Sequence, residues 1–371
     1  MIEINSMPKL GFGLMRLPTN EGVIDKAQVC RMIDTYMSKG FNYFDTAYVY
    51  HGGESETVVK AALVERYPRD SFYLATKLPA WAMKGPEDRD RIFSEQINRC
   101  GVDYFDFYLL HSLEDGNNYQ TYADYDCFSW AMEKKNQGRI RHFGFSYHGT
   151  PELLEQVLDQ HPEIEFVQIQ LNYADWNNPV VQSGKLYEIL HTRQIPIIVM
   201  EPVKGGTLAK LSPELEAVLK SARPHDSTAS WAMRFAGSLD GVMTILSGMS
   251  NQGQVEDNLA TFTSFEPLST EERGLIDAVV KKMLDMPLIQ CTSCRYCCDG
   301  CPVGIHIPDV FRALNTVRMY PQDNRPHMFY NGLTSTSGKA SACVGCGQCE
   351  SVCPQHLPVI ELMREAAEKL G

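Results

Sequence analysis

Short apolar segments alternate with longer amphipathic stretches along the first 270 residues. The apolar segments recur about every thirty residues, at 10–14, 41–44, 71–75, 105–110, 142–145, 166–169, 195–199 and 242–246. Between them, stretches such as 55–65, 151–160 and 228–235 have apolar residues three and four positions apart, as in a helix with one buried face. This alternation predicts parallel strands joined by right-handed helical crossovers.

Eight strand and helix units within ~250 residues are typical of a (β/α)8 barrel. A doubly wound open sheet is the main alternative, but no GxGxxG turn follows the first apolar segment. We therefore expect an α/β protein with a (β/α)8 TIM barrel over residues 1–266. A small, mainly helical module should follow over residues 267–371.

The pattern after the barrel is helical, with one polar interruption. A helix is predicted over 267–284, where Ser269 and Glu272 have the spacing of a capping box. Helical apolar spacing returns over 307–319 and 357–370. The stretch 322–340 is polar and rich in Gly, Ser and Asn, which predicts a loop.

Two runs of cysteine share one spacing in this C-terminal part. The spacing is C-x2-C-x2-C-x3-C-P, and the runs are Cys291, Cys294, Cys297 and Cys301, and Cys343, Cys346, Cys349 and Cys353. Four-cysteine zinc sites usually use two separated pairs, and disulfides belong to secreted proteins. The spacing instead resembles that of bacterial ferredoxins and predicts two 4Fe-4S clusters.

The resemblance to two-cluster ferredoxins also implies a crossed ligand scheme. In those proteins the fourth cysteine of each run binds the cluster held by the other run. Cys301 would therefore complete the site of the second run, and Cys353 that of the first.

The composition and net charge of the chain limit which classes of partner and which cellular compartment are expected. The chain has 371 residues and a formal net charge of -12, which argues against a nucleic-acid partner. No apolar run approaches the ~18 residues of a membrane helix, and the N-terminus lacks a signal-peptide pattern. Because eight cluster thiolates require a reducing compartment, we expect a soluble, cytoplasmic protein without a membrane partner.

In a (β/α)8 barrel, the chemistry lies at the C-terminal ends of the strands. The polar residues that close the predicted strands are Asp45, Lys77, His111, Ser146, Asn172, Glu201 and Ser247. Taken singly, such residues have structural explanations as helix caps or solvated charges. Their order along successive strands favours one shared site at the barrel mouth.

Five motifs in family order resemble the aldo/keto reductase family over residues 10–258. They are Asp45-Thr46-Ala47-Tyr48-Val49-Tyr50, Gly53-Glu54-Ser55-Glu56, Ala75-Thr76-Lys77, Leu109-Leu110-His111 and Gly144-Phe145-Ser146. The resemblance implies that Tyr50 protonates a carbonyl oxygen as a nicotinamide delivers hydride. It also implies that Lys77 favours the phenolate, that Asp45 holds Lys77, and that His111 orients the carbonyl.

The same resemblance implies a nicotinamide cofactor, NAD(H) or NADP(H). Its binding residues would be Ser146, Gln168, Met200, Ser247, Gly248, Asp257 and Asn258. Met200 replaces the usual aromatic ring, while Gly248 and Gln254 replace cations that would neutralise a 2′-phosphate. The choice between NADH and NADPH therefore stays open, and the structural alternatives are a turn at Gly248 and a helix cap at Asn258.

Three functional hypotheses follow, because a hydride carries two electrons and a cluster passes one. The first is a nicotinamide-dependent oxidoreductase for a small carbonyl or alcohol, with the clusters as relay or structural element. The second is a barrel enzyme fed single electrons by ferredoxin or a flavoprotein, and the third is a non-catalytic electron carrier. The intact tetrad argues against the third, and oligomerisation stays open. Candidates for an aromatic pocket wall are Trp81, Tyr119, Tyr122, Trp130 and Trp176.

Overall fold

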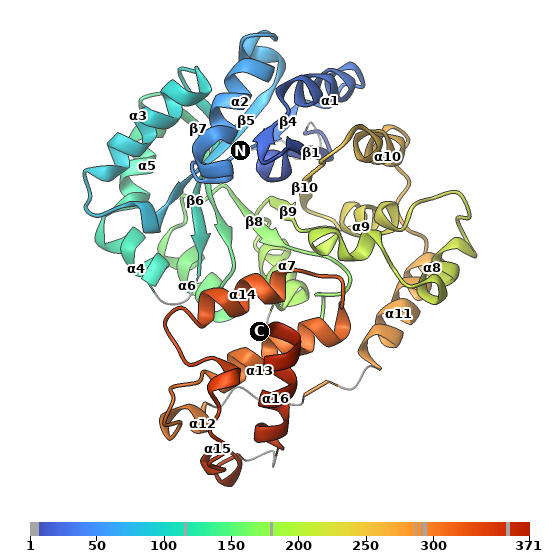
Figure 1. Cartoon of the computed structure of the whole chain (residues 1–371). Helices are drawn as coiled ribbons and strands as arrows, with labels where there is room; N and C mark the ends of the chain where they lie inside the picture. Colours follow the sequence, from blue (N-terminus) through green and yellow to red (C-terminus); the bar gives the residue numbers. More distant parts are fainter. Residues whose placement is uncertain are drawn as a thin grey trace. The chain divides into compact units, whose positions relative to one another are not determined.

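The computed structural model describes residues 7–114, 117–178, 181–285, 288–289, 291, 295–353 and 357–371. The chain divides into two compact units (Figure 1). The first unit consists of Met1–Lys210 and Leu219–Arg273, and the second of Leu211–Val218 and Gly274–Gly371. No helix in the described ranges is both long and apolar enough to cross a membrane.

In the described part of the first unit, eight parallel strands close into a barrel, as predicted. The strands are β1 (Leu10–Gly13), β4 (Tyr43–Asp45), β5 (Tyr73–Pro79), β6 (Phe105–Leu113), β7 (Ile140–Tyr147), β8 (Phe166–Gln170), β9 (Ile197–Met200) and β10 (Val242–Ser247). Pairing of β1 with both β4 and β10 closes the ring. A short antiparallel pair, β2 (Thr19–Asn20) and β3 (Val23–Ile24), follows β1.

Helices surround this barrel in Figure 1. They are α1 (Lys26–Ser38), α2 (Glu54–Val59), α3 (Asp88–Cys100), α4 (Asn117–Asp124), α5 (Cys127–Asn136), α6 (Pro151–Gln160), α7 (Ser183–Thr192), α9 (Thr228–Gly237) and α10 (Gln252–Thr263). Helix α6 is an example of how the sequence fixes the start of a helix. The Thr150 side chain accepts a hydrogen bond from the Leu153 backbone N–H, and Pro151 occupies the first turn. Its buried residues, including Leu154 and Val157, form one face.

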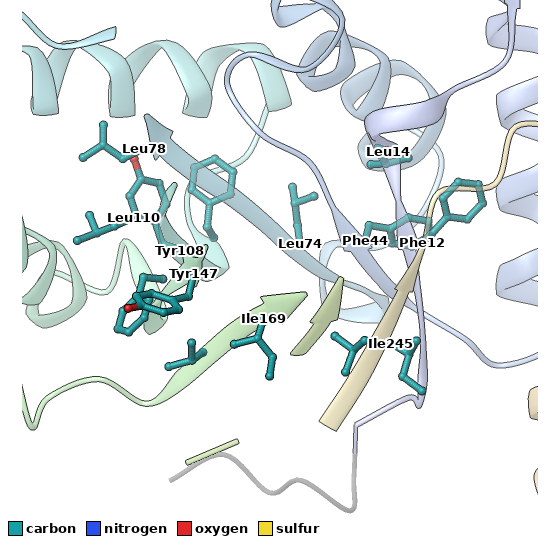
Figure 2. Close-up of a cluster of buried hydrophobic side chains, with 14 of the residues drawn as sticks. Phe12, Leu14, Phe44, Leu74, Leu78, Tyr108, Leu110, Tyr147, Ile169 and Ile245 are labelled. Carbon is teal, nitrogen blue, oxygen red and sulfur yellow. The ribbon is translucent and has the colours of Figure 1, made fainter. Parts of the chain in front are cut away.

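Alternate residues of the strands pack in two layers. Tyr43, Phe107 and Phe166 fill the barrel interior, with ring centroids 5.1 and 5.2 Å apart for successive pairs. Phe12 and Phe44 belong instead to the larger core, which also contains residues of the surrounding helices; Figure 2 shows part of it. Because the interior is packed rather than open, only the strand ends are left to form a site.

The second unit is helical in its described residues. Its elements are α8 (Pro213–Lys220), α11 (Thr270–Leu284), α12 (Tyr296–Asp299), α13 (Ile307–Met319), α14 (Arg325–Leu333), α15 (Gln348–Ser351) and α16 (Val359–Leu370), although α8 and α11 each span the division between the units. The predicted capping box is present: Ser269 Oγ accepts from the Glu272 N–H at 3.2 Å, and Glu272 Oε2 accepts from the Ser269 N–H at 2.8 Å.

The predicted loop over 322–340 is wrong, because α14 occupies Arg325–Leu333. Pro326 lies in its first turn, and Pro326 and Tyr330 are buried four residues apart on one face. The Tyr330 hydroxyl accepts from the Ala340 N–H at 2.8 Å, which fixes the chain after the helix. The polar residues around these two positions hide the helical spacing in the sequence.

Candidate active site and cluster site

Asp45 and Lys77 meet at the ends of neighbouring strands. Strand β4 ends at Asp45, which pairs in register with Ala75 of β5, two residues before Lys77. Lys77 Nζ donates to Asp45 Oδ1 at 2.5 Å and to the Thr46 carbonyl at 2.7 Å. The two side chains are 0% and 3% exposed, so the pair is shielded from water. Such a pair interacts strongly because little solvent screens it.

Tyr50 lies beside this ion pair in the turn after β4. The Lys77 ammonium is 5.0 Å from the centroid of the Tyr50 ring. Burial raises the pKa of the Tyr50 phenol above its ordinary value, and the Lys77 charge opposes that rise. Although burial disfavours the Lys77 ammonium, the charge of Asp45 and the interaction with Tyr50 raise the pKa of Lys77. Lys77 is therefore a cation beside the phenol at neutral pH.

His111 completes the group from strand β6. Its ring centroid lies 5.9 Å from that of Tyr50 in an edge-to-face arrangement. Burial, together with the nearby Lys77 charge, lowers the pKa of His111 well below its ordinary value. The imidazole is thus neutral at neutral pH, and its buried Nδ1 has no hydrogen-bond partner among the described residues. The structure therefore brings Asp45, Tyr50, Lys77 and His111 together.

Of the aromatic candidates for a pocket wall, Trp81 stands beside this group. Its ring centroid is 5.1 Å from that of His111, and the residue is 53% exposed. Tyr122 and Trp130 are instead buried in the core. Trp176 packs against Tyr187 and Phe235. Tyr119 donates to Gln160 Oε1 at the surface.

Ser146, Gln168 and Met200 also converge, at the ends of β7, β8 and β9. Ser146 and Gln168 are register partners, and Ser146 Oγ accepts from the Ser112 N–H at 2.8 Å. Gln168 Nε2 lies 3.5 Å from Met200 Sδ. Gln168 Oε1 is buried without a hydrogen-bond partner among the described residues, so a ligand N–H would satisfy it. This acceptor fits the amide of a nicotinamide carboxamide.

The residues after β10 form a second polar group. Asn258 Nδ2 donates to Ser247 Oγ at 2.8 Å, while Asp257 Oδ2 accepts from the Ser227 hydroxyl at 2.7 Å. Asn251 caps α10 by accepting from the Gln254 N–H at 3.0 Å. Ser247 and Asn258 therefore lie together, whereas the Asp257 side chain is bonded to the residue that caps α9.

Arg16, which belongs to none of the motifs in the sequence, lies against Gly248. A Cβ atom at position 248 would lie 3.1 Å from Arg16 Cδ, so the missing side chain leaves room for the Arg16 stem. Arg16 Nη2 is 3.4 Å from Glu201 Oε1, and the Arg16 side chain is 42% exposed. A cation therefore lies beside Gly248 after all, contributed by the segment after β1. The sequence holds no signal for it, because the two positions are 232 residues apart.

Four cysteines surround one hollow in the second unit. They are Cys301, Cys343, Cys346 and Cys349, and the apolar residues beside them include Ile305 and Met363. This set unites the fourth cysteine of the first run with the first three of the second. Four thiols around an apolar hollow suit a 4Fe-4S cube, whose irons each take one thiolate. The arrangement agrees with the crossed ligand scheme, which stays a prediction.

The first run is described in part. Cys294 lies outside the described residues, while Cys291, Cys297 and Cys353 are half-buried. Burial and the neighbouring Cys298 thiol raise the pKa of the Cys297 thiol to about 12. Among the described residues, no three His, Cys, Asp or Glu side chains gather closely enough to hold a single metal ion.

Comparisons with known proteins agree with both parts of the chain. The model of the aldo/keto reductase family matches residues 9–281, and that of a 4Fe-4S dicluster domain matches residues 290–357. An L-galactose dehydrogenase of Arabidopsis thaliana is 24% identical over 75% of this chain and 92% of its own length. An aldo-keto reductase of Mycolicibacterium smegmatis is 31% identical over 55% of this chain and 67% of its own length.

Solved structures show the same barrel. The aldo-keto reductase AKR11C1 from Bacillus halodurans, in its holo form, is 25% identical, with a TM-score of 0.60 over 73% of this chain and 91% of its own. An aldo/keto reductase from Klebsiella pneumoniae in complex with NADP and acetate is 21% identical, with a TM-score of 0.61 over 74% and 92%. The chain therefore belongs to the aldo/keto reductase family of oxidoreductases and carries a 4Fe-4S dicluster domain in its C-terminal part.

Proposed function

We propose that the barrel reduces an aldehyde or ketone, or oxidises the corresponding alcohol, with a nicotinamide cofactor. One observation carries this proposal: the buried Lys77 ammonium and the neutral His111 ring both lie next to the Tyr50 ring. A phenol needs a nearby cation to exchange protons near neutral pH, and Lys77 supplies it. NADP-bound relatives of the same fold support the cofactor class.

Each residue of the group has a separate task in this reaction. Tyr50 gives its proton to the carbonyl oxygen, and Lys77 stabilises the phenolate that remains. Asp45 holds the ammonium in place through the 2.5 Å contact. The neutral His111 ring hydrogen-bonds the carbonyl oxygen and so orients it. A bound nicotinamide would supply the hydride, with Ser146 and Gln168 holding its carboxamide and Met200 against its ring.

Trp81 supports a substrate with a flat apolar face. An exposed indole beside the His111 ring can stack on a sugar ring or an aromatic carbonyl compound. The similarity to an L-galactose dehydrogenase favours the sugar. Trp81→Ala should raise KM about tenfold for such a substrate and leave kcat nearly unchanged, because stacking acts on ground and transition states alike. An unchanged KM would remove Trp81 from the substrate site.

The experiment that tests the function measures NADPH and NADH oxidation with a panel of sugars and aldehydes, under anaerobic conditions. Tyr50→Phe should lower kcat at least about 100-fold, because a positioned general acid contributes this much. Tyr67→Phe is the matched control, since Tyr67 donates to Asp34 away from the mouth. If Tyr50→Phe keeps full turnover, Tyr50 is not the acid.

A second function is favoured by the exposed Cys346 at the cluster hollow. Here ferredoxin or a flavoprotein would exchange single electrons with the clusters, with Tyr50 still handling the proton. Low-temperature EPR before and after adding NADPH, then NADH, distinguishes this function from ordinary hydride transfer. Reduced-cluster signals from a nicotinamide would join the barrel and the clusters in one electron path. If only dithionite produces such signals, ordinary hydride transfer is the reaction of the barrel.

The proposed localisation follows from the cysteines. With either function, the eight thiolates would require a reducing compartment such as the cytoplasm.

A further inference from the structure

The segment 341–348, called here the cysteine loop, exposes one edge of the cluster hollow. Cys346 is exposed to solvent, unlike the half-buried Cys301, Cys343 and Cys349. Val344 lines the hollow and is nevertheless 65% exposed. Gln348 lines it as well and is also exposed. A cluster held in this hollow would thus have one side near solvent, bordered by the cysteine loop.

The cysteine loop itself has no acidic or basic side chain. All ten residues at 340–349 are uncharged, although the chain as a whole has a net charge of -12. The next acidic residue, Glu350, is half-buried and accepts from the Ile360 N–H at 2.9 Å. The first cysteine run differs, because the exposed Arg295 lies within it and pairs with Asp309 at 3.0 Å. Charged side chains therefore flank the cysteine loop, at the exposed Lys339 and the half-buried Glu350, but none lies within the loop.

Two glycines shape the cysteine loop around Cys346. Gly345 and Gly347 have φ values of 65° and 77°, in the left-handed region that favours glycine. A Cβ atom on Gly347 would meet no described atom within 4 Å, so open space surrounds it. The two glycines thus flank the exposed Cys346 with backbone that carries no side chain. A second protein can therefore approach this edge closely.

We propose that the cysteine loop is the electron port of this protein. Its partner is a one-electron carrier whose cofactor edge is bordered by uncharged, apolar side chains. Each encounter moves one electron: the reduced carrier is oxidised by one electron and the cluster beside Cys346 is reduced by one, or the reverse, with no bond made or broken. The proposal rests on the assignment of Cys301, Cys343, Cys346 and Cys349 as ligands of one cluster.

The kind of partner follows from the charges. Oppositely charged rims steer and orient electron carriers that associate through electrostatics. The cysteine loop itself contributes no charged side chain to such a rim, and Val344 instead offers apolar area beside the exposed Cys346. Small apolar contacts of this kind suit weak, short-lived redox complexes.

The first test locates the port with small oxidants of opposite charge. Stopped-flow absorbance follows the dithionite-reduced full-length protein as it is oxidised by ferricyanide or by tris(phenanthroline)cobalt(III). Val344→Glu and the isosteric Gln348→Glu should lower the rate of cluster oxidation by the anionic ferricyanide about threefold or more. Both should raise the rate with the cationic cobalt complex, because each adds a carboxylate beside the port. Iron content and EPR of each variant show that the clusters are intact.

Met328→Glu is the matched control. Met328 is 72% exposed on α14, which lies at the opposite end of this unit from α15 in Figure 1. Its rates should stay within about 1.5-fold of the parent protein, since the added charge is distant and screened by salt. If Val344→Glu and Gln348→Glu behave like Met328→Glu, electrons leave elsewhere and the port is overturned. Gln348→Glu alone decides the matter if Val344→Glu fails to fold.

The second test concerns the apolar contact. Oxidised azurin, a one-electron carrier, serves as the protein probe and oxidises the dithionite-reduced clusters under anaerobic conditions. Val344→Ser should lower the second-order rate constant about fivefold, because apolar area is lost at the centre of the contact, while the ferricyanide rate is unchanged. Equal rates for Val344→Ser and the parent protein would overturn the apolar docking.

Both tests are independent of the proposed carbonyl chemistry. They use neither nicotinamide nor carbonyl substrate, so they succeed or fail even if the barrel has another activity. Carbonyl turnover of Val344→Glu, measured separately with NADPH, shows whether the port also serves the barrel.

Discussion

Lys77 and Asp45 form an ion pair that water does not reach, with Nζ and Oδ1 2.5 Å apart at the ends of neighbouring strands. Removing one partner leaves the other charge buried and uncompensated. Asp45→Asn should therefore lower the free energy of unfolding by about 3–5 kcal/mol, measured by anaerobic chemical denaturation. Asp34→Asn is the control: its exposed pair with Arg66 should cost less than about 1 kcal/mol. Equal losses for the two variants would contradict a special role for the buried pair.

The pH dependence of carbonyl reduction follows from the directions of two pKa shifts. Burial lowers the pKa of His111 well below its ordinary value, so the imidazole stays neutral as the pH falls through ~6.5. Burial raises the pKa of Tyr50, so the phenol keeps its proton at neutral pH. The kcat for reduction should thus show no histidine inflection near ~6.5 and should fall only in the alkaline range, where Tyr50 loses its proton.

Lys77→Met provides the matching control in a pH profile. Without the ammonium, the pKa of Tyr50 should rise further, and the alkaline limb should move to higher pH as kcat falls. An acidic inflection near ~6.5 in the parent protein would instead show that His111 titrates normally. Such a result would contradict the burial of its ring.

Arg16 should contribute to the choice of cofactor, because its aliphatic stem packs on Gly248 and its guanidinium, 3.4 Å from Glu201 Oε1, is a cation near a position where the sequence has none. Arg16→Gln should raise the Kd for NADPH about tenfold and that for NADH less than about threefold, because a charge-assisted bond to the 2′-phosphate is lost. Quenching of tryptophan fluorescence, without any carbonyl, measures both constants. Arg31→Gln, on the exposed face of α1, is the control. Equal losses for the two cofactors would contradict a contact with the 2′-phosphate.

Cys301→Ser should damage the cluster built mainly on the second cysteine run. Cys301 shares its hollow with Cys343, Cys346 and Cys349, so its loss removes one iron ligand there. Iron content should fall, and EPR of the dithionite-reduced protein should lose or alter one of two cluster signals. Cys298→Ser, off the ligand spacing, should change neither. Two undisturbed clusters in Cys301→Ser would refute the crossed scheme.

Hydrophobic spacing predicted the barrel because each strand and helix must bury one face. The apolar segments at 105–110 and 242–246 became β6 and β10, and the helix predicted over 151–160 matches α6. The C-terminal ends of all strands meet at one mouth of a (β/α)8 barrel. The sequence pattern alone therefore predicts that Asp45, Lys77 and His111 lie close together. Their chemical roles came from the family resemblance and stay predictions.

Other features depend on contacts that spacing does not record. Arg16 lies against Gly248 only because β1 closes the barrel on β10, and no local pattern reports that closure. Helix α14 is hidden because two buried residues, Pro326 and Tyr330, suffice to fix it among polar neighbours. The left-handed backbone of Gly345 and Gly347 follows from the folded loop rather than from hydropathy.

The hollow around Cys301 has a consequence for how the protein is made. Its walls come from residues as distant as Cys301 and Met363, the latter in the second turn of α16. When only the first cysteine run has left the ribosome, Cys301 is therefore the one cysteine of this hollow that has been synthesised. A cluster in this hollow would therefore have all of its walls only after the chain is synthesised through α16.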